Sequence, residues 1–212
     1  MTTLEHVLPA DIEKTSFSII ARELSESGIK IPEELAPVIM RVIHTTADFE
    51  YASTLKFSPN VLEIIKSAIR SGADIVTDTN MALSGINKKA LGQFGGEVHC
   101  FMADEQVAAE AKRRNLTRAA VSMEKASQLP KPLVFAVGNA PTALVELCSL
   151  IESGFSPVAV IGVPVGFVNV VAAKEMIMSA EIPYIVNEGR KGGSTVAAAI
   201  CNAILYELAK RS

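Results

Sequence analysis

From residue 72 onward, the sequence alternates between short apolar runs rich in β-branched residues and longer segments with helical spacing. The runs are DIVTD (74–78), EVHCFM (97–102), PLVFAV (132–137), PVAVIGV (157–163) and PYIVN (183–187). The helical segments cover about 86–94, 104–128 with a break near Asn115, 141–153, 170–181 and 193–211. Nearly continuous apolar strands that alternate with helices are typical of a parallel sheet buried on both faces. We therefore predict an α/β fold with a mainly parallel sheet of roughly five strands.

The first 71 residues carry helix signals and no clear strand. Helical spacing covers 9–28, with Asp11 as a candidate N-cap, and 32–48, where Pro37 must lie in the first turn or bend the helix. A third helix is expected over 58–72, with Ser58 as its cap and Pro59 as its first residue. No linker or repeat interrupts the chain. We predict one domain, 1–212, with a helical N-terminal portion (1–71) and a parallel α/β portion (72–212).

The composition argues against several classes of protein. Hydrophobic residues make up 49% of the 212 residues and charged residues 20%, as in a globular protein. The net charge of −3 gives no reason to bind nucleic acid or an anionic membrane, and no apolar run reaches the ~20 residues of a membrane span. The three cysteines form no C-x-x-C pair, and the N-terminal segment lacks a signal peptide's apolar stretch. We expect a cytoplasmic protein with reduced thiols.

Polar and glycine-rich stretches follow four of the predicted strands. They are TDTNMALSG (77–85), VGNAPTAL (137–144), GVPVGFVN (162–169) and NEGRKGGST (187–195). Because parallel strands end at a shared edge, these loops are expected to form one ligand pocket, although connecting loops need Gly, Pro and Asn as turn residues in any case. GNAPTAL ends a strand and opens a helix, with Pro141 near its first position, and free backbone N–H groups there are suited to a carboxylate or phosphate.

The glycine-rich loops do not match nucleotide-binding motifs. In GRKGGST, Lys191 precedes Gly192 and not Ser or Thr, so the segment is not a P-loop. GVPVGFVN lacks the G-x-G-x-x-G spacing of a dinucleotide site. Arg190 and Lys191 remain as a cationic pair that is suited to carboxylates.

One of the three histidines lies in an unusual setting. In a helix, Arg41, His44 and Asp48 fall at i, i+3 and i+7 and share a face. The Asp48 carboxylate would favour the imidazolium form of His44, whereas Arg41 would oppose that form or bind the substrate. His44 is then either a proton donor or a hydrogen-bonded core residue. His99 is most simply a strand residue, and His6 is expected to be exposed. No second histidine or cysteine has ligand spacing, so we expect no metal held by the protein.

The motifs together resemble one known family nearly end to end. DIEKTSFSII (11–20), RVIHTTADFEYASTLKFSPN (41–60), TDTNMALSGI, VGNAPTAL, GVPVGFVNV and NEGRKGGSTVAAAI are similar, in content and order, to the precorrin-8X methylmutases. This family includes the cobalt-precorrin-8 methylmutases of cobalamin biosynthesis, and HTTADFEYA is more similar to these cobalt-handling members.

The resemblance implies an isomerase that moves a methyl group between adjacent carbons of a contracted tetrapyrrole and yields a cobyrinic or hydrogenobyrinic acid. It implies a three-layer α/β/α fold, a homodimer with active sites near the subunit interface, and His44 as the acid that protonates the macrocycle. No organic cofactor is expected, and any cobalt arrives inside the substrate.

Such a substrate is a broad apolar disc with carboxylates around its rim, so it requires scattered cations and polar loop residues. The candidate substrate contacts are Ser16, Arg22, Arg41, Asp48, Thr79, Arg118, Asn139, Thr142, Gly166, Arg190, Lys191 and Ser194. Two alternatives remain. A non-catalytic tetrapyrrole carrier would use the same pocket without His44. A flavodoxin-like domain would bind a phosphorylated ligand at the same edge, but the aromatic content of 5% leaves few rings to stack on a flavin.

Overall fold

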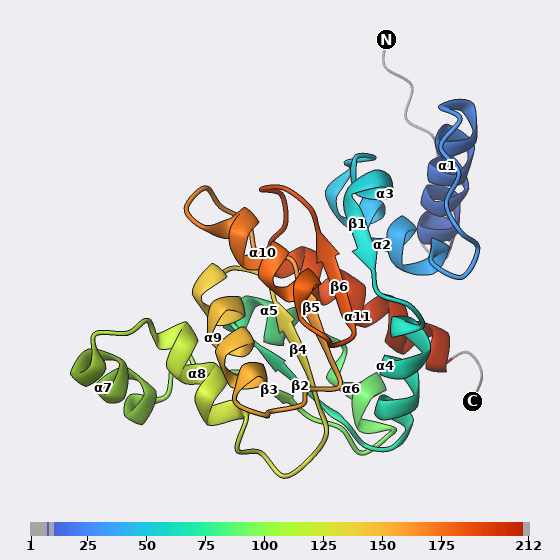
Figure 1. Ribbon diagram of the computed structural model, residues 1–212. Coiled ribbons are helices and arrows are strands. Elements are labelled where there is room, and N and C mark those ends of the chain that lie inside the picture. Colours follow the sequence, from blue (N-terminus) through green and yellow to red (C-terminus); the bar gives the residue numbers. More distant parts are fainter. Residues whose placement is uncertain (1–7, 9–10, 210–212) are drawn as a thin grey trace.

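The centre of the protein is a six-stranded sheet with the order β1-β6-β5-β4-β2-β3 (Figure 1). The computed structural model describes residue 8 and residues 11–209; the predicted exposure of His6 lies outside them. The strands are β1 (Leu55–Phe57), β2 (Asp74–Thr77), β3 (Val98–His99), β4 (Leu133–Val137), β5 (Ala159–Gly162) and β6 (Tyr184–Asn187). All neighbouring strands are parallel except β1, which pairs antiparallel with β6. The predicted mainly parallel α/β sheet is confirmed, with all five predicted strands present.

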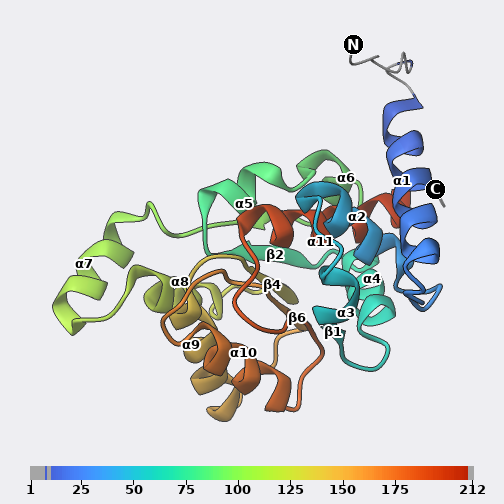
Figure 2. The same ribbon diagram turned by 90° about the horizontal axis from the view of Figure 1, so that it is seen from above.

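Helices cover both faces of the sheet (Figure 2). The layer on one face contains α3 (Tyr51–Thr54), α4 (Val61–Arg70), α5 (Asn80–Gly85), α6 (Lys88–Gly92) and α11 (Ser194–Ala209). In the same layer, α2 (Ala36–Thr46) packs on α11, and α1 (Ile12–Glu26) packs on α2. The other face packs against α8 (Arg118–Ala126), α9 (Pro141–Glu152) and α10 (Val170–Ser179), and α7 (Glu105–Arg114) packs on α8. Because successive strand residues point to opposite faces, Ile75 belongs to the first core and Val76 to the second. The molecule therefore has three layers.

The sixth strand, β1, was not predicted. It has only three residues, and its register with β6 pairs Leu55 with Asn187 and Phe57 with Ile185. So short an edge strand has little pattern of its own and forms because β6 offers free backbone groups. Residues 1–71 are therefore not wholly helical, since they contribute one edge of the sheet.

Several helix ends differ from the prediction. The helix expected over 58–72 begins at Val61, and its N-cap is Asn60 in the left-handed conformation (φ 59°). Ser58 is not the cap, because its hydroxyl accepts a hydrogen bond from the Tyr184 N–H (2.8 Å) where the chain leaves β1. The helix expected from residue 32 begins at Ala36, with Pro37 in its first turn as anticipated.

The break near Asn115 is confirmed, and two short helices that were not predicted, α3 and α5, appear. Asn115 has φ 55° and separates α7 from α8. Of the two short helices, α5 follows Thr79, whose hydroxyl accepts a hydrogen bond from the Ala82 N–H (3.1 Å) and caps the helix. Within the described part of the chain, no helix combines the length and apolar character needed to cross a bilayer.

The strand order places a topological switch point between β2 and β4. From β2 the chain moves outward to β3, and it then returns to the opposite side of β2 to form β4, β5 and β6. In open α/β sheets, ligands bind at the carboxyl ends of the strands beside such a point. The loops after β2 and β4 are therefore the central walls of the candidate site.

Candidate active site

His44 lies in the last turn of α2 and is exposed. Its ring packs against Phe17 of α1, with ring centroids 5.3 Å apart. Within the described residues, the imidazole forms no hydrogen bond or ion pair. The histidine is therefore not a hydrogen-bonded core residue, and both ring nitrogens are available to a ligand.

Arg41, one turn earlier on α2, is engaged by neighbouring side chains. Its guanidinium lies over the rings of Phe17 (5.0 Å) and Tyr206 (4.9 Å), and its Nη2 atom is 2.6 Å from a Glu13 carboxylate oxygen. These residues line a groove of about 640 Å³ between α1, α2 and α11. His44 does not line the groove, but its aromatic neighbour Phe17 does, so the groove opens beside the histidine.

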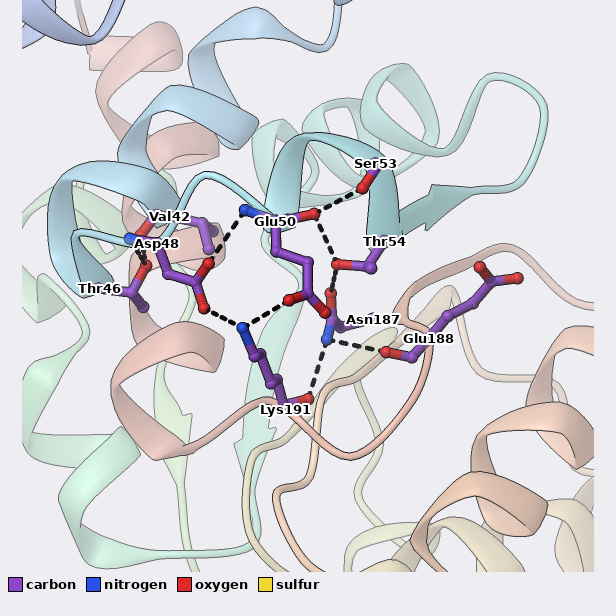
Figure 3. Close-up of polar contacts among 9 residues, drawn as sticks. All are labelled: Val42, Thr46, Asp48, Glu50, Ser53, Thr54, Asn187, Glu188 and Lys191. Atoms are coloured by element: carbon purple, nitrogen blue, oxygen red, sulfur yellow. Dashed lines mark hydrogen bonds and ion pairs between the residues drawn. The ribbon is translucent and has the colours of Figure 1, made fainter. Parts of the chain in front are cut away.

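Asp48 does not share a helical face with His44, and this prediction is wrong. The helix ends at Thr46, and Ala47 has a left-handed conformation (φ 53°), which turns the chain. The Asp48 carboxylate accepts a hydrogen bond from the Glu50 N–H (3.0 Å) and lies 2.5 Å from Lys191 Nζ (Figure 3). The hydrogen bond from Lys191 lowers the pKa of Asp48 below its ordinary value. Its partner is thus the lysine of a distant loop.

The loop after β6, residues 188–193, is held by two buried donors. Lys174 Nζ donates hydrogen bonds to the carbonyls of Gly189 and Lys191, both at 2.8 Å. The Asn187 amide donates to the carbonyls of Glu188 (3.1 Å) and Lys191 (2.9 Å), as Figure 3 shows. Lys174 is 1% exposed, and this burial lowers its pKa to about 8. Sequence reasoning missed Lys174, although a lysine within the apolar segment VVAAKEMIM is a signal for a buried cation.

The same loop contacts the loop after β5. The Arg190 guanidinium carbon lies 5.4 Å from the centroid of the Phe167 ring, and the Gly166 N–H donates to the Arg190 carbonyl (3.2 Å). Gly166 has φ 152°, which a residue with a side chain rarely adopts. Phe167 is 82% exposed and Val168 78%, so an apolar surface stands beside an arginine at this edge.

At the switch point, the hydroxyl oxygens of Thr79 and Ser194 lie 2.8 Å apart. Three of the backbone N–H groups expected to bind a ligand there are occupied. Asp78 accepts hydrogen bonds from the N–H groups of Gly138 (2.8 Å), Asn139 (2.8 Å) and Ala140 (2.6 Å). Burial raises the pKa of Asp78 above its ordinary value, and these bonds oppose the shift. The Asn139 side chain remains exposed.

The remaining candidates lie on helices. The Thr117 hydroxyl donates to the Thr142 hydroxyl (2.8 Å), next to Arg118 at the start of α8. Arg118 is exposed and has no hydrogen bond or ion pair within the described residues. On α1, the Ser16 hydroxyl donates to the Ile12 carbonyl (2.9 Å), and Arg22 forms an exposed ion pair with Glu26 (3.8 Å). No hydrogen bond or ion pair links Arg22 to another candidate within the described part of the chain.

The fold and these side chains define an open-sheet α/β protein that presents an imidazole and several polar loops near the carboxyl edge of its sheet. Comparison with known proteins assigns the family, because the family model described as Precorrin-8X methylmutase matches residues 11–207. The chain is 45% identical over 199 residues to the cobalt-precorrin-8 methylmutase of Priestia megaterium. The aligned region covers 93% of this chain and 88% of that protein.

A second relative and a solved structure support the same family assignment. The cobalt-precorrin-8 methylmutase of Leptospira interrogans is 42% identical over 213 residues, or 96% of each protein. The crystal structure of precorrin-8X methyl mutase from Thermus thermophilus is similar with a TM-score of 0.85 and 38% identity, over 95% of this chain and 98% of that one. The chain belongs to the precorrin-8X methylmutase family and is an isomerase of the methylmutase type.

Proposed function

We propose that the chain converts cobalt-precorrin-8 to its cobyrinic acid-type isomer, with His44 as the general acid. The bond between the methyl carbon and one ring carbon breaks while the bond to the adjacent ring carbon forms, so no atom is gained or lost. A proton or strong hydrogen bond from His44 to the macrocycle lowers the electron density that resists migration. The observation that carries the proposal is the exposed His44 ring, without a hydrogen-bond partner in the described chain and packed against Phe17.

The cobalt form is proposed as the substrate because two similar relatives are named cobalt-precorrin-8 methylmutases. The metal is part of that substrate and is not held by the protein. The family match leaves the flavodoxin-like alternative without support.

The candidate cations differ in their availability to substrate carboxylates. Arg41, Arg22 and Lys191 already form ion pairs with Glu or Asp side chains. Arg118 and Arg190 form no ion pair within the described residues, so we assign the carboxylate contacts to them first. Polar contacts are assigned to the exposed or half-buried residues Ser16, Thr79, Asn139, Thr142, Gly166 and Ser194.

A homodimer remains part of the proposal. In Figures 1 and 2, α1 extends from the body of the protein, and Ile12 and Ile19 are exposed on it. An apolar side of a projecting helix is suited to a second copy of the chain. Light scattering during gel filtration tests this point.

A cytoplasmic location also stays a prediction, and the three free cysteines are consistent with it.

The test of the function is to incubate the purified protein and His44→Ala with cobalt-precorrin-8 and to follow the absorbance spectrum. Loss of a general acid lowers the rate by ~10²–10⁴-fold, so the variant should bind pigment and convert it that much more slowly. Full turnover by a folded His44→Ala protein would remove His44 from the mechanism. Release of unaltered pigment from the wild-type protein would favour a carrier.

A further inference from the structure

We propose that Lys191 is a positioning residue, which ties the segment after His44 to the loop after β6, and that it does not contact the substrate. The inference rests on the proposed role of His44. It changes the role expected for Lys191 from the sequence, where this lysine was a candidate partner of substrate carboxylates.

The charges around Lys191 argue against a substrate contact. Its Nζ atom lies 2.5 Å from an Asp48 carboxylate oxygen and 2.7 Å from a Glu50 carboxylate oxygen (Figure 3). Two carboxylates around one ammonium leave a net negative charge. A third carboxylate from the substrate would be repelled unless it displaced one of them.

The contacts of Lys191 act on the segment that carries His44. The chain turns at Ala47 directly after the last turn of α2, and Asp48 and Glu50 lead into α3. The other hydrogen bonds of this turn are local, such as Ala47 N–H to the Ile43 carbonyl (2.7 Å). The ion pairs to Lys191 join it to a loop more than 140 residues away in sequence.

The ion pairs of Lys191 with Asp48 and Glu50 form a tether, and its other end is fixed in the sheet. The Lys191 carbonyl accepts hydrogen bonds from both Lys174 and Asn187, which are buried. Two residues later, the Gly193 N–H donates to the Val163 carbonyl (2.9 Å) at the end of β5. The backbone that carries the ammonium is thus held to β5 and β6, so Lys191 can transmit their position to the His44 segment.

Exposed ion pairs contribute little to global stability. Removing this tether is therefore expected to reduce the local order of the segment after His44 and the rate of catalysis. The variants are Lys191→Met, Asp48→Asn and their combination. Lys56→Met is the matched control: its side chain is 41% exposed, against 46% for Lys191, and it also pairs with a carboxylate, that of Glu188 (3.3 Å). Each protein is examined by steady-state kinetics with cobalt-precorrin-8 and by amide hydrogen exchange.

Lys191→Met should lower kcat by roughly 10- to 100-fold with an unchanged KM, because a small misplacement of a catalytic group has an effect of that size. Adding Asp48→Asn to Lys191→Met should cause no further loss, since both changes remove the same contact. Amides 46–50 should exchange faster in Lys191→Met and not in Lys56→Met. A raised KM with unchanged kcat, or additive losses in the double variant, would overturn the inference.

The exchange measurement separates this inference from the proposed function. Full turnover by His44→Ala would defeat the proposed function while the exchange rates still report on the tether. Unchanged exchange at 46–50 in Lys191→Met would refute the tether, whatever the activity of the protein.

Discussion

The Phe17 ring lies against the His44 imidazole, with ring centroids 5.3 Å apart and planes tilted by 30°. The same phenyl ring lies under the Arg41 guanidinium. One aromatic side chain of α1 thereby contacts the two residues of α2 that the sequence singled out, and it determines where the exposed imidazole can lie.

Replacing this ring tests its contribution to catalysis. Phe17→Leu keeps an apolar side chain but removes a contact between rings that is worth about 0.5–1.5 kcal/mol. We expect kcat to fall by roughly 2- to 12-fold, because the imidazole loses a preferred orientation. Steady-state kinetics measure this effect. Ser18→Ala, an exposed change on the same helix, serves as the control, and equal kcat values for the two variants would contradict the prediction.

Asp78 is expected to hold the loop after β4 in place. In Asp78→Asn, the side-chain amide cannot accept from all three N–H groups of residues 138–140, so at least one buried donor is left unpaired. An unpaired buried donor costs about 1–3 kcal/mol, and urea denaturation should show a loss of that size. Asp104→Asn changes the half-buried N-cap of α7, which accepts two backbone N–H groups, and should have a smaller effect. Equal losses would show that burial of Asp78 is not what matters.

Gly192 allows a close approach between two site loops. A Cβ atom there would lie 2.1 Å from the Val163 carbonyl oxygen, and the residue has φ 159°. Gly192→Ala should therefore displace the loop and reduce both thermal stability and activity. Gly189→Ala is the control, because Gly189 also has a positive φ (75°) but no atom within 4 Å of the added Cβ. If the two variants melt at the same temperature, the close contact is not important.

Lys174 should give the protein a characteristic dependence of stability on pH. Its pKa in the folded state is about 8, below its ordinary value of 10.5, so between these pH values the unfolded chain holds a proton that the folded chain has lost. The free energy of unfolding should thus rise with pH over this window, by about 3 kcal/mol from this group. Below pH 8 Lys174 is protonated in both the folded and the unfolded chain, so this group no longer makes the free energy of unfolding depend on pH.

The measurement compares the wild-type protein with Lys174→Met by urea denaturation at pH 7.5 and at pH 10. Other lysines and tyrosines titrate in both proteins, so the difference between the two isolates Lys174. The wild-type protein should gain stability relative to the variant as the pH rises. A constant difference would mean that Lys174 titrates normally in the fold.

Local patterns in the sequence are enough to predict the parallel α/β portion and the order of its elements along the chain. Apolar strand runs and helical spacing are local properties, and they predicted β2 to β6, the break at Asn115 and the four polar loops. The family motifs likewise depend only on the order of residues. The same local properties do not decide the exposure of His44, because a histidine at the end of an apolar helix suits either the core or the surface.

The pairing of polar groups, in contrast, depends on how the chain packs in three dimensions. Asp48 and Lys191 form an ion pair across 143 positions of sequence, and β1 forms by pairing with β6. Asp78 accepts hydrogen bonds from three N–H groups, of residues 138–140, that the sequence offers to a ligand. Each of these outcomes depends on which donor and acceptor the fold brings within 3 Å of each other, and a buried donor takes whichever partner is nearest. Spacing along the chain carries no information about that distance, because the packing of the helices on the sheet sets it.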